Sequence, residues 1–245
     1  AKPGNKANIH AVMADAAEKI IKAASTKVYS LSTHQRRIPI PASSLKQGIK
    51  TTRTLGASDK VLFIGSSTGG PRALNTLVPE LPETLPAAVV IVQHMPVGFT
   101  RSLADRLDSI SRIKAKEAEP GDKLEVGRAL LAPGGFHMLF DRNGQVTLNQ
   151  NPTVHGVRPA IDVTLASMVP QYGKSMMSVI LTGMGSDGTT GCQLVHEAGG
   201  YVIAEDESTC IVWGMPRSVY EAGVADAVLP LTEIAGGIQR KLAKF

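Results

Sequence analysis

The sequence predicts a doubly wound, Rossmann-like α/β fold with a mainly parallel sheet and an antiparallel hairpin inserted near its middle. Apolar runs of strand length, such as VLFI at 61–64 and AAVVIV at 87–92, alternate with amphipathic stretches of helical length. Continuous apolar runs are typical of strands that are buried on both faces, as in parallel sheets. An Asn-Gly pair at 143–144, between two short strand-like segments, favours a tight hairpin turn.

The first βα unit begins with the apolar run at 61–64 and turns at the segment GSSTGG. A helix at 71–81 follows, because Pro71 suits the first position of a helix. A second buried strand then leads into an amphipathic helix. Two shorter apolar segments and the two hairpin strands complete this half of the chain. The expected ranges after the first unit are 87–93 (strand), 99–109 (helix), 113–118 and 128–132 (strands), and 137–140 and 145–148 (hairpin).

The second half of the chain repeats the alternation of helix and strand. The run MMSVIL is its most apolar segment and predicts another buried strand. Repeated βα units of this kind imply helices on both faces of the sheet. The expected ranges are 160–169 (helix), 176–181 (strand), 187–198 (helix), 201–204 (strand), 216–222 (helix), 227–229 (strand) and 231–243 (helix).

The basic character of the chain lies in its N-terminal segment. Residues 1–60 carry 11 Lys and Arg against 3 Asp and Glu, whereas residues 61–245 carry 15 against 18. Residues 9–24 have helical spacing of apolar residues. Residues 25–59 resemble a polar linker, and the alternative is an extended segment pressed onto the domain. We therefore expect an N-terminal helix and basic linker at 1–59 and a globular domain at 60–245. No aromatic-studded basic face accompanies the charge, which argues against nucleic-acid binding.

Composition excludes several other classes of protein. The longest apolar runs are too short to cross a bilayer, so no membrane insertion is expected. Cys192 and Cys210 lack metal-ligand spacing and predict a reduced, cytoplasmic protein in which both are small core residues. No His-x-x-x-His or paired Cys/His spacing occurs, so neither a metal nor another cofactor is expected.

The turn after the first strand carries a candidate nucleophile. Gly65, Ser67 and Gly69 fit the spacing G-x-S-x-G, in which glycines let a sharp turn expose a serine hydroxyl beside a helix N-terminus. The alternative is a glycine-rich βα turn that binds phosphate or packs tightly. A P-loop and the dinucleotide fingerprint G-x-G-x-x-G both differ from this segment, although a nucleotide-binding module remains the rival from another class.

Polar residues follow the ends of three predicted strands, where ligands bind in doubly wound sheets. They are Ser67, His94, and a group that contains Thr182, Ser186 and Asp187. An imidazole beside the serine can accept its proton, and a carboxylate can orient the ring. Taken singly, His94 could be a structural histidine and Asp187 a helix N-cap. His137 and His155, in or beside the hairpin, could line a cleft.

Five segments, in order, resemble the chemotaxis receptor methylesterase (CheB) family over residues 60–245. They are GSSTGGPRAL, IVQHMPVGFT, APGGFHM, ILTGMGSDGTTG and GMPRSVYEAG. The resemblance implies a serine hydrolase that removes methyl esters from glutamate side chains on the cytoplasmic helices of chemotaxis receptors. Many members of the family also deamidate receptor glutamines. A generic small-molecule serine esterase is the alternative within the hydrolases.

The resemblance also assigns roles to residues. It makes Ser67 the nucleophile, His94 the base and Asp187 the acid that orients His94. It places the backbone N–H of Met184 at the oxyanion, with the elbow residues Thr68 and Ser66 beside the substrate. The chain order Ser, His, Asp differs from that of the α/β-hydrolases.

Two features depart from the family pattern. Gly135 and Phe136 stand where the family usually carries more polar residues. Members also usually carry a phosphorylatable receiver domain before the catalytic domain, which the resemblance implies as a partner in the full-length protein. Residues 2–24 resemble the end of such a receiver; an unrelated linker helix is the alternative.

Overall fold

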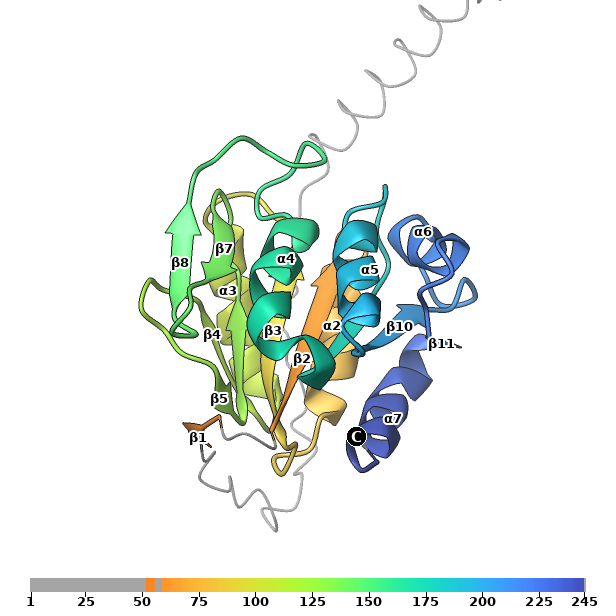
Figure 1. The fold of residues 1–245 in the computed structure, drawn as a ribbon, viewed down its shortest axis with the longest axis horizontal. Helices are drawn as coiled ribbons and strands as arrows, with labels where there is room; N and C mark the ends of the chain where they lie inside the picture. Colours follow the sequence, from red (N-terminus) through yellow and green to blue (C-terminus); the bar gives the residue numbers. More distant parts are fainter. Residues whose placement is uncertain (1–51, 56–58, 245) are drawn as a thin grey trace, which may run out of the picture. The chain divides into compact units, whose positions relative to one another are not determined.

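The central sheet contains seven parallel strands, which confirms the predicted fold class (Figure 1). The computed structural model describes residues 52–55 and 59–244, all within one compact unit, Gln47–Phe245. The strand order is β11-β10-β9-β2-β3-β6-β4. The bounds are β2 (Lys60–Ser66), β3 (Ala87–Gln93), β4 (Lys114–Glu117), β6 (Arg128–Leu131), β9 (Met176–Ile180), β10 (Tyr201–Glu205) and β11 (Ala227–Leu229).

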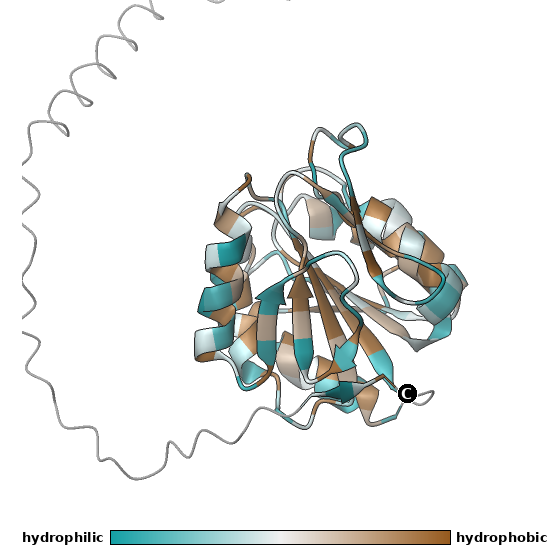
Figure 2. Ribbon diagram, turned by 90° about the vertical axis from the view of Figure 1, so that its left-hand side faces the viewer, coloured by the Kyte–Doolittle hydropathy of each residue, from teal (hydrophilic) through white to brown (hydrophobic). Residues whose placement is uncertain are grey.

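Helices cover both faces of the sheet, so the apolar strands are buried between two layers (Figure 2). Leu62 and Ile64 of β2 pack toward α2, α3 and α7, whereas Val61 and Phe63 pack toward α4, α5 and α6. This alternation follows from the two-residue period of a strand. The bounds are α2 (Gly70–Leu77), α3 (Phe99–Ile110), α4 (Ile161–Tyr172), α5 (Thr189–Glu197), α6 (Met215–Glu221) and α7 (Leu231–Leu242), with 3-10 turns η1 (Val78–Glu80) and η2 (Gly173–Ser175).

Two antiparallel pairs lie outside the main sheet. The predicted hairpin is confirmed as β7 (His137–Phe140) and β8 (Val146–Asn149), closed by the Gly144 N–H donating to Asp141 O at 2.9 Å. The second pair joins β1 (Arg53–Thr54) to β5 (Glu125–Val126). β1 therefore lies against the domain as an extended segment within the stretch expected to be a linker, and its partner lies some seventy residues further along the chain.

Several element boundaries differ from the predictions by a few residues; α2, for example, ends at Leu77 rather than at 81, and a 3-10 turn follows it. α5 begins at Thr189 rather than 187, because Gly188 adopts a left-handed φ of 98° that no helix accommodates. α4 continues through Pro170 to Tyr172 instead of ending at 169.

Other sequence predictions have mixed outcomes. Cys192 is buried as expected, but Cys210 is only half-buried; both are free thiols. The predicted helix at 9–24 lies outside the described residues. Among the helices in the described part of the chain, none is long and apolar enough to span a membrane.

β2 is the strand at which the direction of winding changes. From β2 the chain crosses through α2 to β3 on one side, and β9, which leads through α5 to β10, pairs with the other side of β2. In doubly wound sheets such a switch point leaves a crevice beyond the carboxyl ends of the strands. The turns after β2, β3 and β9 therefore meet at one edge.

Candidate active site

Ser67 and His94 become neighbours because β2 and β3 run in parallel with matched ends. Ser66 pairs with Gln93 in the register, and each candidate residue comes directly after. The His94 N–H donates to Ser66 O at 3.1 Å. On the other side of β2, the Ser67 N–H donates to Thr182 O at 3.0 Å, which ties the serine to the chain leaving β9.

The backbone around Ser67 forms a sharp strand-to-helix turn. Gly69 has a left-handed φ of 86°, and the Gly70 N–H donates to Ser67 O at 2.8 Å. The neighbouring chain approaches so closely that a Cβ added at Gly183 would lie 2.8 Å from Ser67 Cβ. Ser67 is partly exposed at the start of α2, so its hydroxyl is accessible. These are the features of a nucleophile elbow.

His94 and Asp187 form an almost fully buried pair. His94 Nε2 lies 2.8 Å from Asp187 Oδ2, and their side chains are 8% and 2% exposed. Burial alone would raise the pKa of Asp187. Hydrogen bonds from His94 and from the N–H groups of Asp162 and Ile161 outweigh that effect and lower its pKa below the ordinary value. Asp187 therefore stays a carboxylate.

The arrangement fixes which imidazole nitrogen is available for proton transfer. Asp187 accepts the hydrogen bond at Nε2, so the neutral ring carries its proton there and Nδ1 is left with the lone pair. Both Ser67 and His94 are described, and no hydrogen bond joins the serine hydroxyl to the ring in this structure. Such contacts are often long before substrate binds.

Two backbone N–H groups beside Ser67 are candidates for stabilising an oxyanion. They belong to Thr68, which is exposed, and Met184, whose side chain is 76% exposed. Within the described residues neither N–H donates a hydrogen bond to the protein. The preceding N–H, of Gly183, is already bound to Val212 O at 3.0 Å. Unpaired N–H groups at this edge can receive a negatively charged oxygen.

Ser66 does not reach this surface, contrary to the expectation that it lies beside the substrate. It is fully buried, and its hydroxyl donates to Gln93 Oε1 at 2.7 Å. The Gln93 side-chain amide donates in turn to Ser67 O at 2.9 Å and to His94 O at 3.0 Å. Successive side chains along a strand point to opposite faces of the sheet, so Ser66 and Ser67 do not share one surface. Through Gln93, Ser66 therefore stabilises the turns that follow β2 and β3.

Sequence reasoning missed Asp162, which lies beside Asp187. Asp162 Oδ1 accepts the N–H groups of Gly188 and Gly191, and Oδ2 lies 2.9 Å from His155 Nε2. A carboxylate in the first turn of a helix normally caps its own helix, so the pattern gave no signal of this contact. His137 instead is buried, and its Nδ1 accepts the Ala160 N–H at 3.3 Å.

The same neighbourhood contains a set of atoms that could hold a metal ion. Ligand atoms of His155, Asp162 and Asp187 lie within 4.8 Å of one another, the one such group among the described residues. Their carboxylate oxygens already accept backbone N–H groups and imidazoles. The group therefore has the geometry of a hydrogen-bond network rather than of a vacant coordination sphere.

Thr182 joins the elbow to the loop that follows β10. Its N–H donates to Glu205 Oε2 at 2.8 Å, and its hydroxyl donates to Thr68 O at 2.9 Å. The hydroxyl oxygen also accepts the N–H groups of Ile211 and Val212. The other polar residue of this predicted group, Ser186, is exposed.

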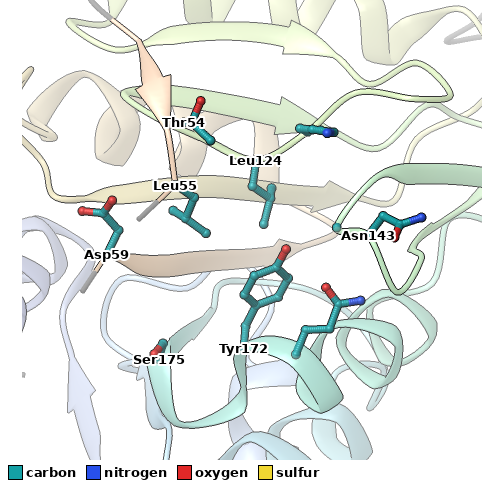
Figure 3. A pocket seen from close by; sticks show the side chains of 10 residues that line it. Thr54, Leu55, Asp59, Leu124, Asn143, Tyr172 and Ser175 are labelled. Atoms are coloured by element: carbon teal, nitrogen blue, oxygen red, sulfur yellow. The ribbon is translucent and has the colours of Figure 1, made fainter. Parts of the chain in front are cut away.

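A cleft of about 460 Å³ opens beside the elbow, lined among others by Gly69, Arg72, Thr182 and Ile211. Large apolar residues are exposed in the chain that follows β3, β9 and β10: Val97, Phe99, Met184 and Ile211, of which Ile211 lines this cleft. A second cleft, of about 400 Å³, lies near Asp59 and Ser175, which precede β2 and β9 (Figure 3). That cleft is at the amino ends of the strands and contains none of the candidate residues.

The comparisons agree on one family. A family model described as CheB methylesterase matches residues 62–238. A curated relative from Symbiobacterium thermophilum, named protein-glutamate methylesterase/protein-glutamine glutaminase, is 54% identical over 76% of this chain and 51% of its own length. A relative with the same name from Thermotoga maritima is 52% identical over 72% of this chain and 52% of its own. The chain thus spans about half the length of these curated relatives.

A solved structure gives the same picture. The crystal structure of the Thermotoga maritima CheB methylesterase catalytic domain has a TM-score of 0.72 and is 49% identical in sequence. The match between the two structures covers 75% of this chain and 98% of that domain.

Proposed function

Because this chain belongs to the CheB methylesterase family, we propose that it hydrolyses glutamyl methyl esters on chemotaxis receptors. The observation that carries the proposal is the His94–Asp187 pair at 2.8 Å, at the edge where the elbow exposes Ser67. The named relatives favour this reaction over a small-molecule esterase or a nucleotide-binding module.

In the proposed mechanism Ser67 Oγ attacks the ester carbonyl while His94 Nδ1 accepts the serine proton. Asp187 stabilises the imidazolium that forms. The oxygen of the tetrahedral intermediate becomes negative and is stabilised by the N–H groups of Thr68 and Met184. His94 returns the proton to the departing methoxide, so methanol leaves and an acyl-serine remains. Water, activated by His94, then releases the glutamate and restores Ser67.

The same steps would deamidate a receptor glutamine, with ammonia leaving in place of methanol. The relatives' printed name includes this second activity. Because an amide has a poorer leaving group than an ester, protonation of the nitrogen by His94 carries more of the work. We therefore expect the ester to be the faster substrate.

The proposed partner is a helical receptor surface that carries the modified side chain. The exposed apolar residues around the elbow, Val97, Phe99, Met184 and Ile211, would contact its apolar positions. An exposed surface of this kind contacts the receptor helices from one side only, and the modified side chain can then reach Ser67.

The decisive experiment measures methanol released from methylated receptor fragments by this chain and by Ser67→Ala. We expect Ser67→Ala to lose activity by several orders of magnitude, because no other group replaces the nucleophile. Ser102→Ala, an exposed serine on α3, is the control and should retain full activity. A fluorophosphonate should modify Ser67, located by peptide mapping. Retained turnover in Ser67→Ala would refute the assignment.

A further inference from the structure

Two carboxylates exchange helix caps at the start of α4 and α5. Asp187, which precedes α5, accepts the Ile161 N–H at 2.7 Å and the Asp162 N–H at 3.0 Å, both at the start of α4. Asp162, in the first turn of α4, accepts the Gly188 N–H at 3.0 Å and the Gly191 N–H at 2.7 Å, at the start of α5. Each carboxylate satisfies amides that would otherwise lack partners.

The exchange determines where the Asp187 carboxylate lies. Gly188 follows Asp187 directly, so the bond from Gly188 N–H to Asp162 holds the backbone of Asp187. The two bonds from the start of α4 hold its carboxylate, whose Oδ2 also faces His94 Nε2. Moving either helix start would therefore move the oxygen that orients the imidazole.

From this geometry we propose that Asp162 is a positioning residue for the His94–Asp187 pair, through the start of α5. The inference rests on the proposed function, because it concerns the same reaction. Asp162 forms no hydrogen bond or ion pair with His94; its oxygens bind Gly188, Gly191 and His155. Its effect on turnover passes through the location of Asp187, and a displacement of about 1 Å at a reacting group can lower a rate by about 100-fold.

Burial disfavours the charged form of Asp162. A carboxylate at this buried position therefore indicates that its hydrogen bonds to α5 are needed. Asp162 is 8% exposed, and its burial raises its pKa; the N–H of Gly191 opposes the rise, while the charge of Asp187 adds to it. His155 Nε2 lies 2.9 Å from Asp162 Oδ2 and 3.9 Å from Asp187 Oδ1, where a proton on the ring would offset both charges. Both oxygens of Asp162 are therefore in use.

A cap that only stabilises the fold makes a different prediction from a positioning residue. Removal of a simple cap lowers the melting temperature and leaves the folded fraction fully active. Removal of a positioning residue lowers kcat in folded protein, with KM little changed. The matched control is Asp226→Ala: Asp226 also accepts a backbone N–H, from Val202 at 2.8 Å, and faces a histidine, His196, at 3.8 Å. It lies at the start of β11, away from Ser67.

Three measurements on Asp162→Ala test the proposal: kcat and KM for the methyl ester, the rate of Ser67 modification by a fluorophosphonate, and the downfield proton resonance of His94 Nε2–H. We expect kcat and the modification rate to fall about 10- to 100-fold. We also expect the resonance to shift or broaden below the melting temperature. Asp162→Asn keeps an acceptor oxygen for Gly188 and Gly191 and should recover most of the rate.

Parental rates and an unchanged resonance in Asp162→Ala, with only its melting temperature lowered as in Asp226→Ala, would overturn the proposal. So would a loss of rate in folded Asp162→Asn as large as that expected for Asp162→Ala. If Asp162→Ala does not fold, Asp162→Glu, which displaces the acceptor by one methylene, takes its place with the same expectations. Fluorophosphonate modification and the His94 resonance do not depend on the receptor, so they separate a failure of this inference from a wrong substrate.

Discussion

At the scale of single residues, Glu205 is a buried carboxylate that forms no ion pair with any described residue. It is fully buried at the end of β10, and its described partners are the Thr182 N–H and the Thr209 hydroxyl. Burial raises its pKa above the ordinary value, and hydrogen bonds from Thr182, Thr209 and Cys210 oppose that rise only in part. The folded protein therefore holds the Glu205 proton more tightly than the unfolded chain does.

This difference predicts how stability depends on pH. The contribution of the Glu205 proton is fully present below the unfolded pKa and is lost as pH rises through the higher folded pKa. We expect Glu205→Gln to raise the melting temperature relative to the parent at neutral pH, with a smaller gain near pH ~4. Calorimetry across this range tests it, with exposed Glu197→Gln as control. A gain that does not vary with pH would contradict the assignment.

At the scale of elements, α4 and α5 touch at a position that only glycine fits. A Cβ at Gly188 would lie 2.9 Å from Ile161 Cγ2 and 3.0 Å from Ile180 Cδ1, and its φ is 98°. Gly199, at the other end of α5, has a φ of 80° and nothing within 4 Å of an added Cβ. A comparison of substitutions at Gly188 and Gly199 therefore distinguishes the effect of steric crowding from that of backbone strain.

We expect Gly199→Ala to lower the free energy of unfolding by about 1–2 kcal/mol, through the left-handed backbone alone. Gly188→Ala adds the cost of overpacking, about 1–3 kcal/mol more. It should also slow the modification of Ser67, because it separates the starts of α4 and α5. Urea unfolding of both variants measures the difference. Equal losses would mean that the contact with Ile161 and Ile180 relaxes freely.

The sequence predicted the elements that have a period and missed those that do not. The apolar run of β2 predicted a buried strand, which the structure confirms, and the turn that follows it predicted the candidate nucleophile Ser67. Strand β1 has two residues, too few for any period, and its partner is remote. Asp162 escaped notice because its role depends on how α4 packs on α5, which no local pattern encodes. Ser66 was misplaced because strand β2 continues two residues beyond the predicted end at residue 64.

At the scale of the whole molecule, the compact unit that contains the candidate site begins before residue 60. Arg53 forms a two-point ion pair with Asp59, Nη2 lying 2.6 Å from Oδ1, and β1 pairs with β5. Leu55 packs against the cluster on the α4 face of the sheet. These contacts place residues 52–55 within the same unit as the elbow.

We therefore expect a chain that begins at residue 47 to unfold in one transition and to keep the modification rate of Ser67. A chain that begins at residue 56 loses β1, Leu55 and the ion pair, and should melt several degrees lower with Ser67 still reactive. Calorimetry and fluorophosphonate labelling of both chains make the comparison. Identical melting temperatures would show that β1 contributes nothing to the unit.

The position of β2 at the switch point also has a consequence for the protein during its synthesis. Strands β3, β4 and β6 emerge from the ribosome soon after β2, but β9 follows about a hundred residues later. Until β9 arrives, β2 is an edge of the sheet, with unpaired N–H and C=O groups that can recruit another chain. The strand that leads to Asp187 is thus also the one that ends this period of vulnerability, so a ribosome that stalls before residue 176 leaves a product that lacks part of the candidate active site and is prone to aggregate.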